Sequence, residues 1–224
     1  MRRSHDQLEA LRRAGDALIE CYRDLAARDA HLAGELIGDD AFEEERHYPA
    51  DDLRDPVSGA QLYFHAHLDD ELGHFHTHVR LAGATAEGDE LVHLVGVSID
   101  ACGLPTRLFA PNCWATDDRW RPAGELRALL DRFTFDDAPR GPVACRALPA
   151  LLRLFRPQID ALLDARDAAV ARDASVLDDR ETRLLATVEV SIDAQIAEVH
   201  RALATSATRS GDGREGERHI AQGR

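Results

Sequence analysis

The chemically distinctive part of this sequence is a short run rich in histidine. Of the 11 histidines in the chain, five lie between positions 65 and 78, and they recur two residues apart: His65, His67, His74, His76 and His78. A neutral imidazole offers a nitrogen lone pair, which suits Zn(II), Fe(II) and related transition metals. The run therefore predicts a metal site or a histidine-lined pocket.

The spacing of these histidines is typical of two β-strands. Residues two apart on a strand share a face, so residues 61–68 and 74–81 each predict a strand with one polar and one apolar face. Tyr63 shares the polar face of the first strand, and Arg80 shares that of the second. The intervening segment carries three acids, including Glu71, and a glycine, which favours a hairpin loop.

Hydrophobic patterning constrains how the two strands pair. Pairing His67 with His74 and His65 with His76 places all five imidazoles and the Tyr63 phenol on one side. A slip by one residue would instead move apolar side chains onto that side. The sequence therefore predicts the register that gathers the histidines.

Two ligand sets fit this hairpin. Three histidines with an open fourth position are typical of zinc hydrolysis, whereas two histidines and a carboxylate are typical of Fe(II) oxygen chemistry. The predicted ligands are His65, His67 and His76, with His74 and His78 as alternates and Glu71 as a carboxylate ligand or general base. The sequence does not decide between zinc and iron.

Composition limits the class of protein. The chain has 224 residues, of which 44% are hydrophobic and 30% charged, and its formal net charge is −14. We expect a globular protein without a membrane span, because no apolar run approaches the roughly 18 residues that a span needs. The acidity argues against a nucleic-acid partner. No secretory signal pattern follows the N-terminus, so the expected location is a bacterial cytoplasm.

We predict a single α+β domain over residues 1–204 and a disordered tail over residues 205–224. A capping box at Ser4 and Gln7 begins an N-terminal helix within residues 1–38. A loop is expected next, and an antiparallel meander of at least four strands follows over residues 60–111. Because His93 alternates with valines in one of these strands, it is expected to be a hydrogen-bonded core residue rather than a ligand.

Helical spacing of apolar residues predicts three C-terminal helices over residues 120–204. The last is expected to run from Leu177 to Leu203, although residues 188–192 alone are also typical of a strand. Helices from both ends of the chain should pack on one face of the sheet. The histidine face would then be open, roofed by loops or covered by a second subunit in a homodimer formed through the C-terminal helices.

Several motifs between residues 47 and 165 resemble an uncharacterised bacterial family known only as a domain of unknown function. They are HYP, DPVSGAQLYFHAH, ELGHFHTHVR, HLVGVSIDACGLPTRLF, NCWAT and LLRLFRPQIDALL. The resemblance covers roughly half of the chain. It implies a shared fold and carries over no activity.

Two shorter resemblances concern the histidines. The segment from His74 to Arg80 is similar to the active-site strand of the histidine triad nucleotide hydrolases and transferases, and this likeness would make His76 the nucleophile. Thr77 and Arg80 depart from that pattern. The segment from Gly59 to Glu71 resembles the first half of a cupin metal motif, in which two histidines and the glutamate bind the metal, but no second cupin motif follows.

Two functional hypotheses follow. The first is a cytoplasmic metal-binding protein, with metal-dependent hydrolase or oxygenase activity as its enzymatic form. The second is a non-enzymatic domain that binds a small molecule or a protein partner on a metal-free histidine face. In either case, Arg80 could clamp the carboxylate or phosphate of an anionic small molecule, and Tyr63 could contact the same ligand.

Overall fold

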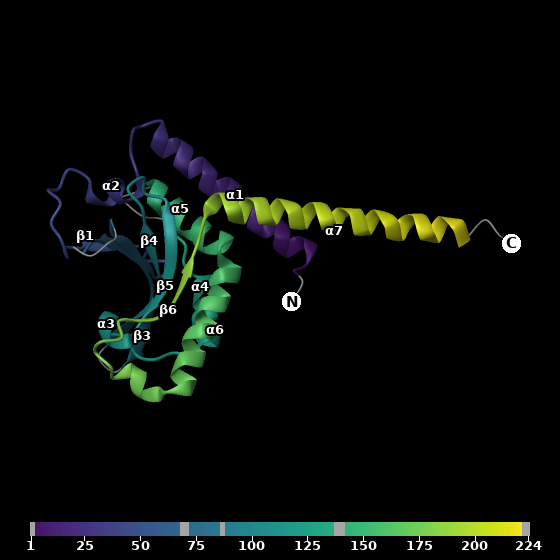
Figure 1. Cartoon of the computed structure of the whole chain (residues 1–224). Helices are drawn as coiled ribbons and strands as arrows, with labels where there is room; N and C mark the ends of the chain where they lie inside the picture. The colour runs from purple at the N-terminus through teal and green to yellow at the C-terminus, as the bar shows by residue number, and fades with distance from the viewer. Residues whose placement is uncertain (1–2, 68–71, 86–87, 137–141, 221–224) are drawn as a thin grey trace.

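The computed structural model contains a six-stranded antiparallel sheet whose strands are ordered as they occur in the chain (Figure 1). It describes residues 3–67, 72–85, 88–136 and 142–220. The first five strands form a continuous meander, and the sixth returns after several helices to pair with the fifth. The strands are β1 (Tyr48–Arg54), β2 (Ala60–His65), β3 (His74–Thr85), β4 (Gly88–Ile99), β5 (Pro105–Pro111) and β6 (Leu184–Glu189).

Helices precede and follow the meander, which confirms the predicted α+β class. They are α1 (His5–Ala26), α2 (Leu32–Ile37), α3 (Cys113–Thr116), α4 (Ala123–Leu130), α5 (Pro142–Leu154), α6 (Arg156–Arg172) and α7 (Ile192–Ile220), with a 3₁₀ turn at Ala174–Leu177. The predicted capping box is present, because the Ser4 hydroxyl accepts from the Gln7 amide and the Gln7 side chain accepts from the Ser4 amide. These two bonds satisfy amides that the first helical turn leaves without partners.

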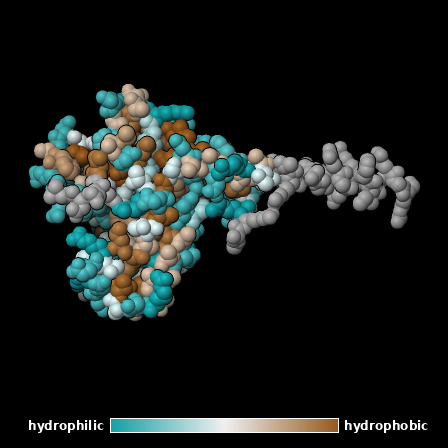
Figure 2. All heavy atoms as spheres, viewed as in Figure 1, coloured by the Kyte–Doolittle hydropathy of each residue, from teal (hydrophilic) through white to brown (hydrophobic). Residues whose placement is uncertain are grey.

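The main helices lie on one side of the sheet (Figure 1). Apolar side chains at alternate positions of β2 and β3, such as Leu62, Phe64 and Phe75, are fully or almost fully buried and join one core with α1, α5 and α6. On the outer surface, apolar and polar side chains are interspersed (Figure 2). The opposite face of the same strands carries the histidines.

The register of β2 and β3 differs by two residues from the predicted one. His65 lies opposite His74, and Tyr63 lies opposite His76. A two-residue slip leaves every side chain on its original face, so hydrophobic patterning cannot detect it. β2 ends at His65, so His67, which the sequence places in the strand, lies beyond it.

A β-bulge in β4 moves His93 to the histidine face. Thr77 of β3 pairs with Val95, but the next residue, His78, pairs with His93, so Leu94 is the additional residue. A bulge of this kind reverses the alternation of side chains beyond it. His93 is buried, as predicted, but it faces the other histidines instead of sharing a face with the valines.

Two strands occupy segments for which the sequence predicts other structure. β1 lies in the predicted loop, where Tyr48 and Leu53 are buried, and Pro49 is tolerated because β1 is an edge strand. β6 interrupts the predicted last helix, because Val188 pairs with Leu108 of β5. Pairing with an existing sheet edge therefore overrides the helical spacing of this segment.

The last helix, α7, runs outward from the body of the protein (Figure 1). It extends to Ile220 and so enters the segment for which a disordered tail is predicted. The boundary of the folded domain at residue 204 stays a prediction. None of the described helices is long and apolar enough to cross a membrane.

Candidate metal centre

Three imidazole nitrogens converge where the end of β2 meets the start of β3. The Nε2 atom of His65 lies 2.7 Å from Nε2 of His74 and 3.2 Å from Nε2 of His76. The ligand-capable atoms of these three residues all lie within 4.8 Å of one another. In a tetrahedral zinc site, two ligand nitrogens are about 3.3 Å apart. The three side chains therefore need only small shifts to hold one cation.

Strand geometry explains this convergence. His74 and His76 share a face of β3 because they are two residues apart, and His65 stands directly opposite His74 and diagonal to His76. The start of β3 is fixed by a hydrogen bond from the Ile99 amide to the Gly73 carbonyl (3.1 Å). Gly73 has a φ of 132°, and a Cβ atom there would lie 2.4 Å from the Phe64 ring, so only glycine fits before His74.

Burial keeps these imidazoles neutral. It lowers the pKa of His65 to about 3, with the neighbouring histidines adding to the effect, and it lowers the pKa of His74 to about 4. Burial, followed by the proximity of His93, also holds the pKa of His76 well below its usual value. Each ring therefore has a nitrogen lone pair available at neutral pH, as metal binding requires.

His93 forms an outer contact to one of the three. Its Nε2 atom lies 2.9 Å from Nδ1 of His76, on the opposite side of the ring from the convergent nitrogens. When His76 donates its Nδ1 proton to His93, the Nε2 atom of His76 carries the lone pair. A second partner of this type commonly orients a metal-binding histidine and fixes its tautomer.

Aromatic rings enclose the cluster. The Phe109 ring packs edge-on against His74 and His76, with centroid distances of 5.2 and 5.8 Å. It lies across Gly96, where a Cβ atom would be 2.1 Å from the ring. On the other side, Tyr63 stacks on His76 at a centroid distance of 5.0 Å. These two rings therefore pack against His76 from different strands, β5 and β2.

The two other predicted histidine ligands lie outside the convergent group. The His67 ring lies 4.6 Å from that of His65 and 5.4 Å from that of His74 by centroids, and it is partly exposed. His78 lies further along β3, where its ring stacks on Tyr63 and meets His93 edge-on. Neither contributes a nitrogen to the group of three.

The three remaining predicted site residues are Tyr63, Arg80 and Glu71. Tyr63 lies inside the cluster, between the histidine rings. Arg80 lies beyond it, where Nη2 donates to Oε1 of Gln61 (2.8 Å) and Nη1 lies 4.0 Å from Oδ2 of Asp89. Glu71, the predicted carboxylate ligand or general base, lies outside the described residues.

Sequence reasoning missed two neighbours of the cluster. Strict alternation places His93 in the core, and the bulge at Leu94, which breaks the alternation, leaves no signal in the sequence. His47 stacks on Tyr63 with a centroid distance of 3.7 Å and approaches Asp52 at 3.3 Å. His47 lies in the HYP motif that the chain shares with the domain-of-unknown-function family, and this motif is the sequence feature that points to it.

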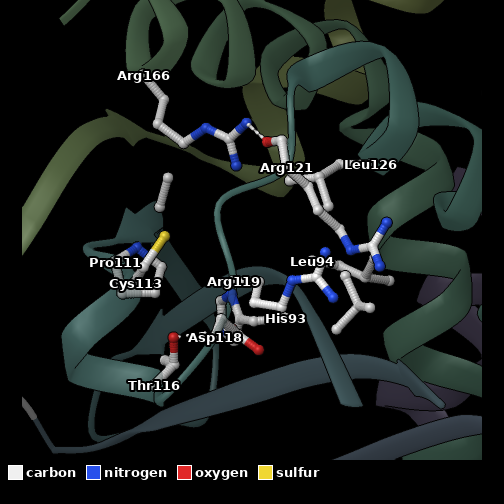
Figure 3. Close-up of a pocket in the computed structure, with 12 residues that line it drawn as sticks. His93, Leu94, Pro111, Cys113, Thr116, Asp118, Arg119, Arg121, Leu126 and Arg166 are labelled. Atoms are coloured by element: carbon white, nitrogen blue, oxygen red, sulfur yellow. Dashed lines mark hydrogen bonds between the residues drawn. The ribbon is translucent and has the colours of Figure 1, made fainter. Parts of the chain in front are cut away.

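A small cavity borders His93 (Figure 3). Its volume is about 30 Å³, enough for a water molecule, and its walls include Thr116 and Asp118 from the segment after β5. Burial raises the pKa of the Asp118 carboxyl to about 6, although a hydrogen bond from Thr116 opposes this shift. None of the three convergent histidines lines this cavity.

The comparison with known families agrees with the predicted resemblance to a domain of unknown function. Residues 12–190 match the model of a family described as Domain of unknown function (DUF6969). The chain belongs to this family. The match spans all six strands and every histidine of the cluster, so the histidine cluster lies within the family domain. No curated protein and no solved structure matches the chain.

Proposed function

We propose that this protein binds one divalent transition metal ion, zinc or iron, through the Nε2 atoms of His65, His74 and His76. The observation that carries the proposal is the convergence of these three atoms in a largely buried site. Relative to the set suggested by the sequence, His74 replaces His67, because the register places His74 opposite His65.

Hydrogen bonding alone satisfies this cluster poorly. Each neutral imidazole has one N–H and one lone pair. His65 Nε2 faces two other Nε2 atoms at hydrogen-bonding distance, but it can donate only one proton or accept with one lone pair. A cation satisfies all three lone pairs at once.

The ligand set also indicates what a bound metal would do. Three neutral histidines leave at least one coordination position for water or another ligand, and such a metal can lower the pKa of bound water and polarise a carbonyl or phosphoryl oxygen. His67 is partly exposed, and its ring lies 4.6 Å from that of His65 by centroids. His93 would orient the His76 ring through its contact with Nδ1 of His76.

Metal content is the first test. Protein purified without a polyhistidine tag should contain about one equivalent of zinc or iron by plasma mass spectrometry, or take it up after chelator treatment. Absence of metal, together with no uptake of Zn(II) or anaerobic Fe(II), would contradict the proposal.

Variants identify the ligands. His74→Ala and His76→Ala should each abolish stoichiometric binding, whereas His67→Ala should retain it. His200→Ala is the matched control, because His200 is an exposed histidine on α7. Loss of metal in His67→Ala together with retention in His74→Ala would instead support the set predicted from the sequence.

His93→Ala tests the outer contact. It should keep one metal per chain at saturation but weaken affinity by about 10–100-fold, because the orientation of His76 is lost. An unchanged affinity, measured by competition with a chromophoric chelator, would show that the contact to His93 does not support the site.

A further inference from the structure

A second polar site lies at the far end of the sheet from the three convergent histidines. It is a groove of about 870 Å³ between the turn that joins β1 to β2 and the middle of β3. Three arginines from separate parts of the chain line it: Arg54 at the end of β1, Arg80 on β3 and Arg132 after α4. Positive side chains therefore gather here in a chain with a net charge of −14.

The acids in the groove do not cancel these charges fully. Asp55 is buried, and its Oδ1 atom accepts the amides of Val57 and Ser58, while Oδ2 accepts the amide of Asp136. Its carboxylate is thus committed to holding the turn. Asp89 is the other acid of the lining, and it lies 4.0 Å from Arg80.

The arginines keep donors available for a ligand. Arg54 is exposed, and its guanidinium makes no hydrogen bond or ion pair with any residue in the described ranges. Arg132 is also exposed, and one of its nitrogens donates to the Ser58 carbonyl (3.1 Å). A guanidinium has five N–H donors in a planar fork, so each of these side chains can still bind an anion.

We infer that this groove binds a small molecule carrying a doubly charged anionic group, either a phosphate or a dicarboxylate. Arg54 and Arg132 would contact it directly, since both side chains line the groove and are exposed. Arginine suits both chemistries because its fork matches phosphate and carboxylate oxygens in pairs. The acidic remainder of the surface would repel such an anion and so favour this groove over other positions.

A chain of polar contacts links the groove to the histidine cluster. Arg80 donates to Gln61, Gln61 donates to Oδ2 of Asp52 (2.6 Å), and Asp52 approaches His47, which stacks on Tyr63. The anion site is nevertheless independent of the proposed metal site, because no proposed metal ligand lines the groove. Its test therefore uses metal-free protein.

The test is isothermal titration of chelator-treated protein with inorganic phosphate and, separately, with succinate at low ionic strength. We expect saturable one-to-one binding of at least one probe, with affinity reduced by about tenfold or more in Arg54→Gln and in Arg132→Gln. Binding of phosphate alone would assign a phosphate ligand, and binding of succinate alone would assign a dicarboxylate.

Arg153→Gln is the matched control, because Arg153 is an exposed arginine on α5 outside the groove. It should bind the probe as the unmodified protein does. If Arg153→Gln weakens binding as much as Arg54→Gln, the effect is general charge attraction and the groove assignment is wrong. Failure of both probes to bind at about 10 mM would also overturn it, since physiological anion sites are usually tighter.

Discussion

The two faces of the strands β2, β3 and β4 are almost equally buried but have opposite chemistry. On one face, Phe75 and Val79 are completely inaccessible, and on the other, His76 and His78 expose only 5% and 3% of their surface. Burying the apolar face stabilises the fold, whereas burying imidazoles is unfavourable unless they stay neutral and find partners. The comparison indicates that the apolar face supplies stability, whereas the histidine face adds stability only where its imidazoles stay neutral and find partners.

Acidification should produce the largest effect on stability, and this effect comes from the histidine face alone. In metal-free protein, burial lowers the pKa of His74 and His78 to about 4, below the value of about 6.5 expected when unfolded. Between these values, the unfolded chain binds protons that the folded chain does not. Stability is therefore complete above about pH 6.5 and should fall by roughly 1.4 kcal/mol per pH unit for each such group as the pH drops toward 4.

Urea unfolding of chelator-treated protein at several pH values measures this slope. Asp118 reduces this loss of stability between about pH 6 and 4, because its raised pKa makes the folded state bind a proton before the unfolded state does. The His78→Leu variant should show a shallower slope, since it removes one of the titrating groups. A free energy of unfolding that is constant from pH 7 to about pH 4.5 would contradict the burial of neutral imidazoles.

Truncation on the apolar face should have the next largest effect. Phe75→Ala removes a fully buried ring from the core and should lower the free energy of unfolding by about 3–5 kcal/mol, independently of metal. Urea unfolding with and without one equivalent of zinc measures this loss of free energy in the metal-free and the metal-containing protein. If the variant lost less than about 1 kcal/mol, the helices would not pack on this face as tightly as the structure indicates.

Overpacking on the histidine face should have an intermediate effect. In Gly96→Ala, the new methyl group would collide with the Phe109 ring and displace it from His74 and His76, at a cost of about 1–3 kcal/mol. Metal affinity should also change, because that ring packs against two proposed ligands.

Gly124→Ala is the control for this substitution. Gly124 lies in α4 with no atom within 4 Å of its Cβ position, so alanine there should stabilise the protein by about 0.4–1 kcal/mol. Thermal unfolding of both variants separates steric collision from the general effect of replacing glycine. Equal melting temperatures for the two variants would be inconsistent with the close packing of Phe109 on Gly96.

The smallest effect is expected for His78→Leu at neutral pH. The Nδ1 atom of His78 is buried and has no hydrogen-bond partner among the described residues, so removing it relieves a desolvation cost of about 1–3 kcal/mol. Loss of the stacking on Tyr63 offsets this gain, and the free energy of unfolding should stay within about 1 kcal/mol of the unmodified protein. A much larger loss would show that His78 stabilises the fold.

Periodicity alone determined much of the site. The two-residue spacing of the histidines specified the strands β2 and β3 and the face on which His74, His76 and His78 lie, because side chains alternate along any strand. The same alternation identified the apolar face, and a run of residues that is apolar on both faces identified the buried strand β4. The helical spacing near each end of the chain likewise predicted α1 and α6.

Tertiary structure decided which histidines meet. The sequence could not distinguish registers two residues apart, since both keep the same faces, so only the folded hairpin places His74 opposite His65, where the predicted register places His76. The bulge at Leu94, which adds His93 to the cluster, is equally invisible to a pattern with a period of two. β1 and β6 form because they pair with neighbouring strands at the sheet edges, and for β6 the partner, β5, is distant in the chain.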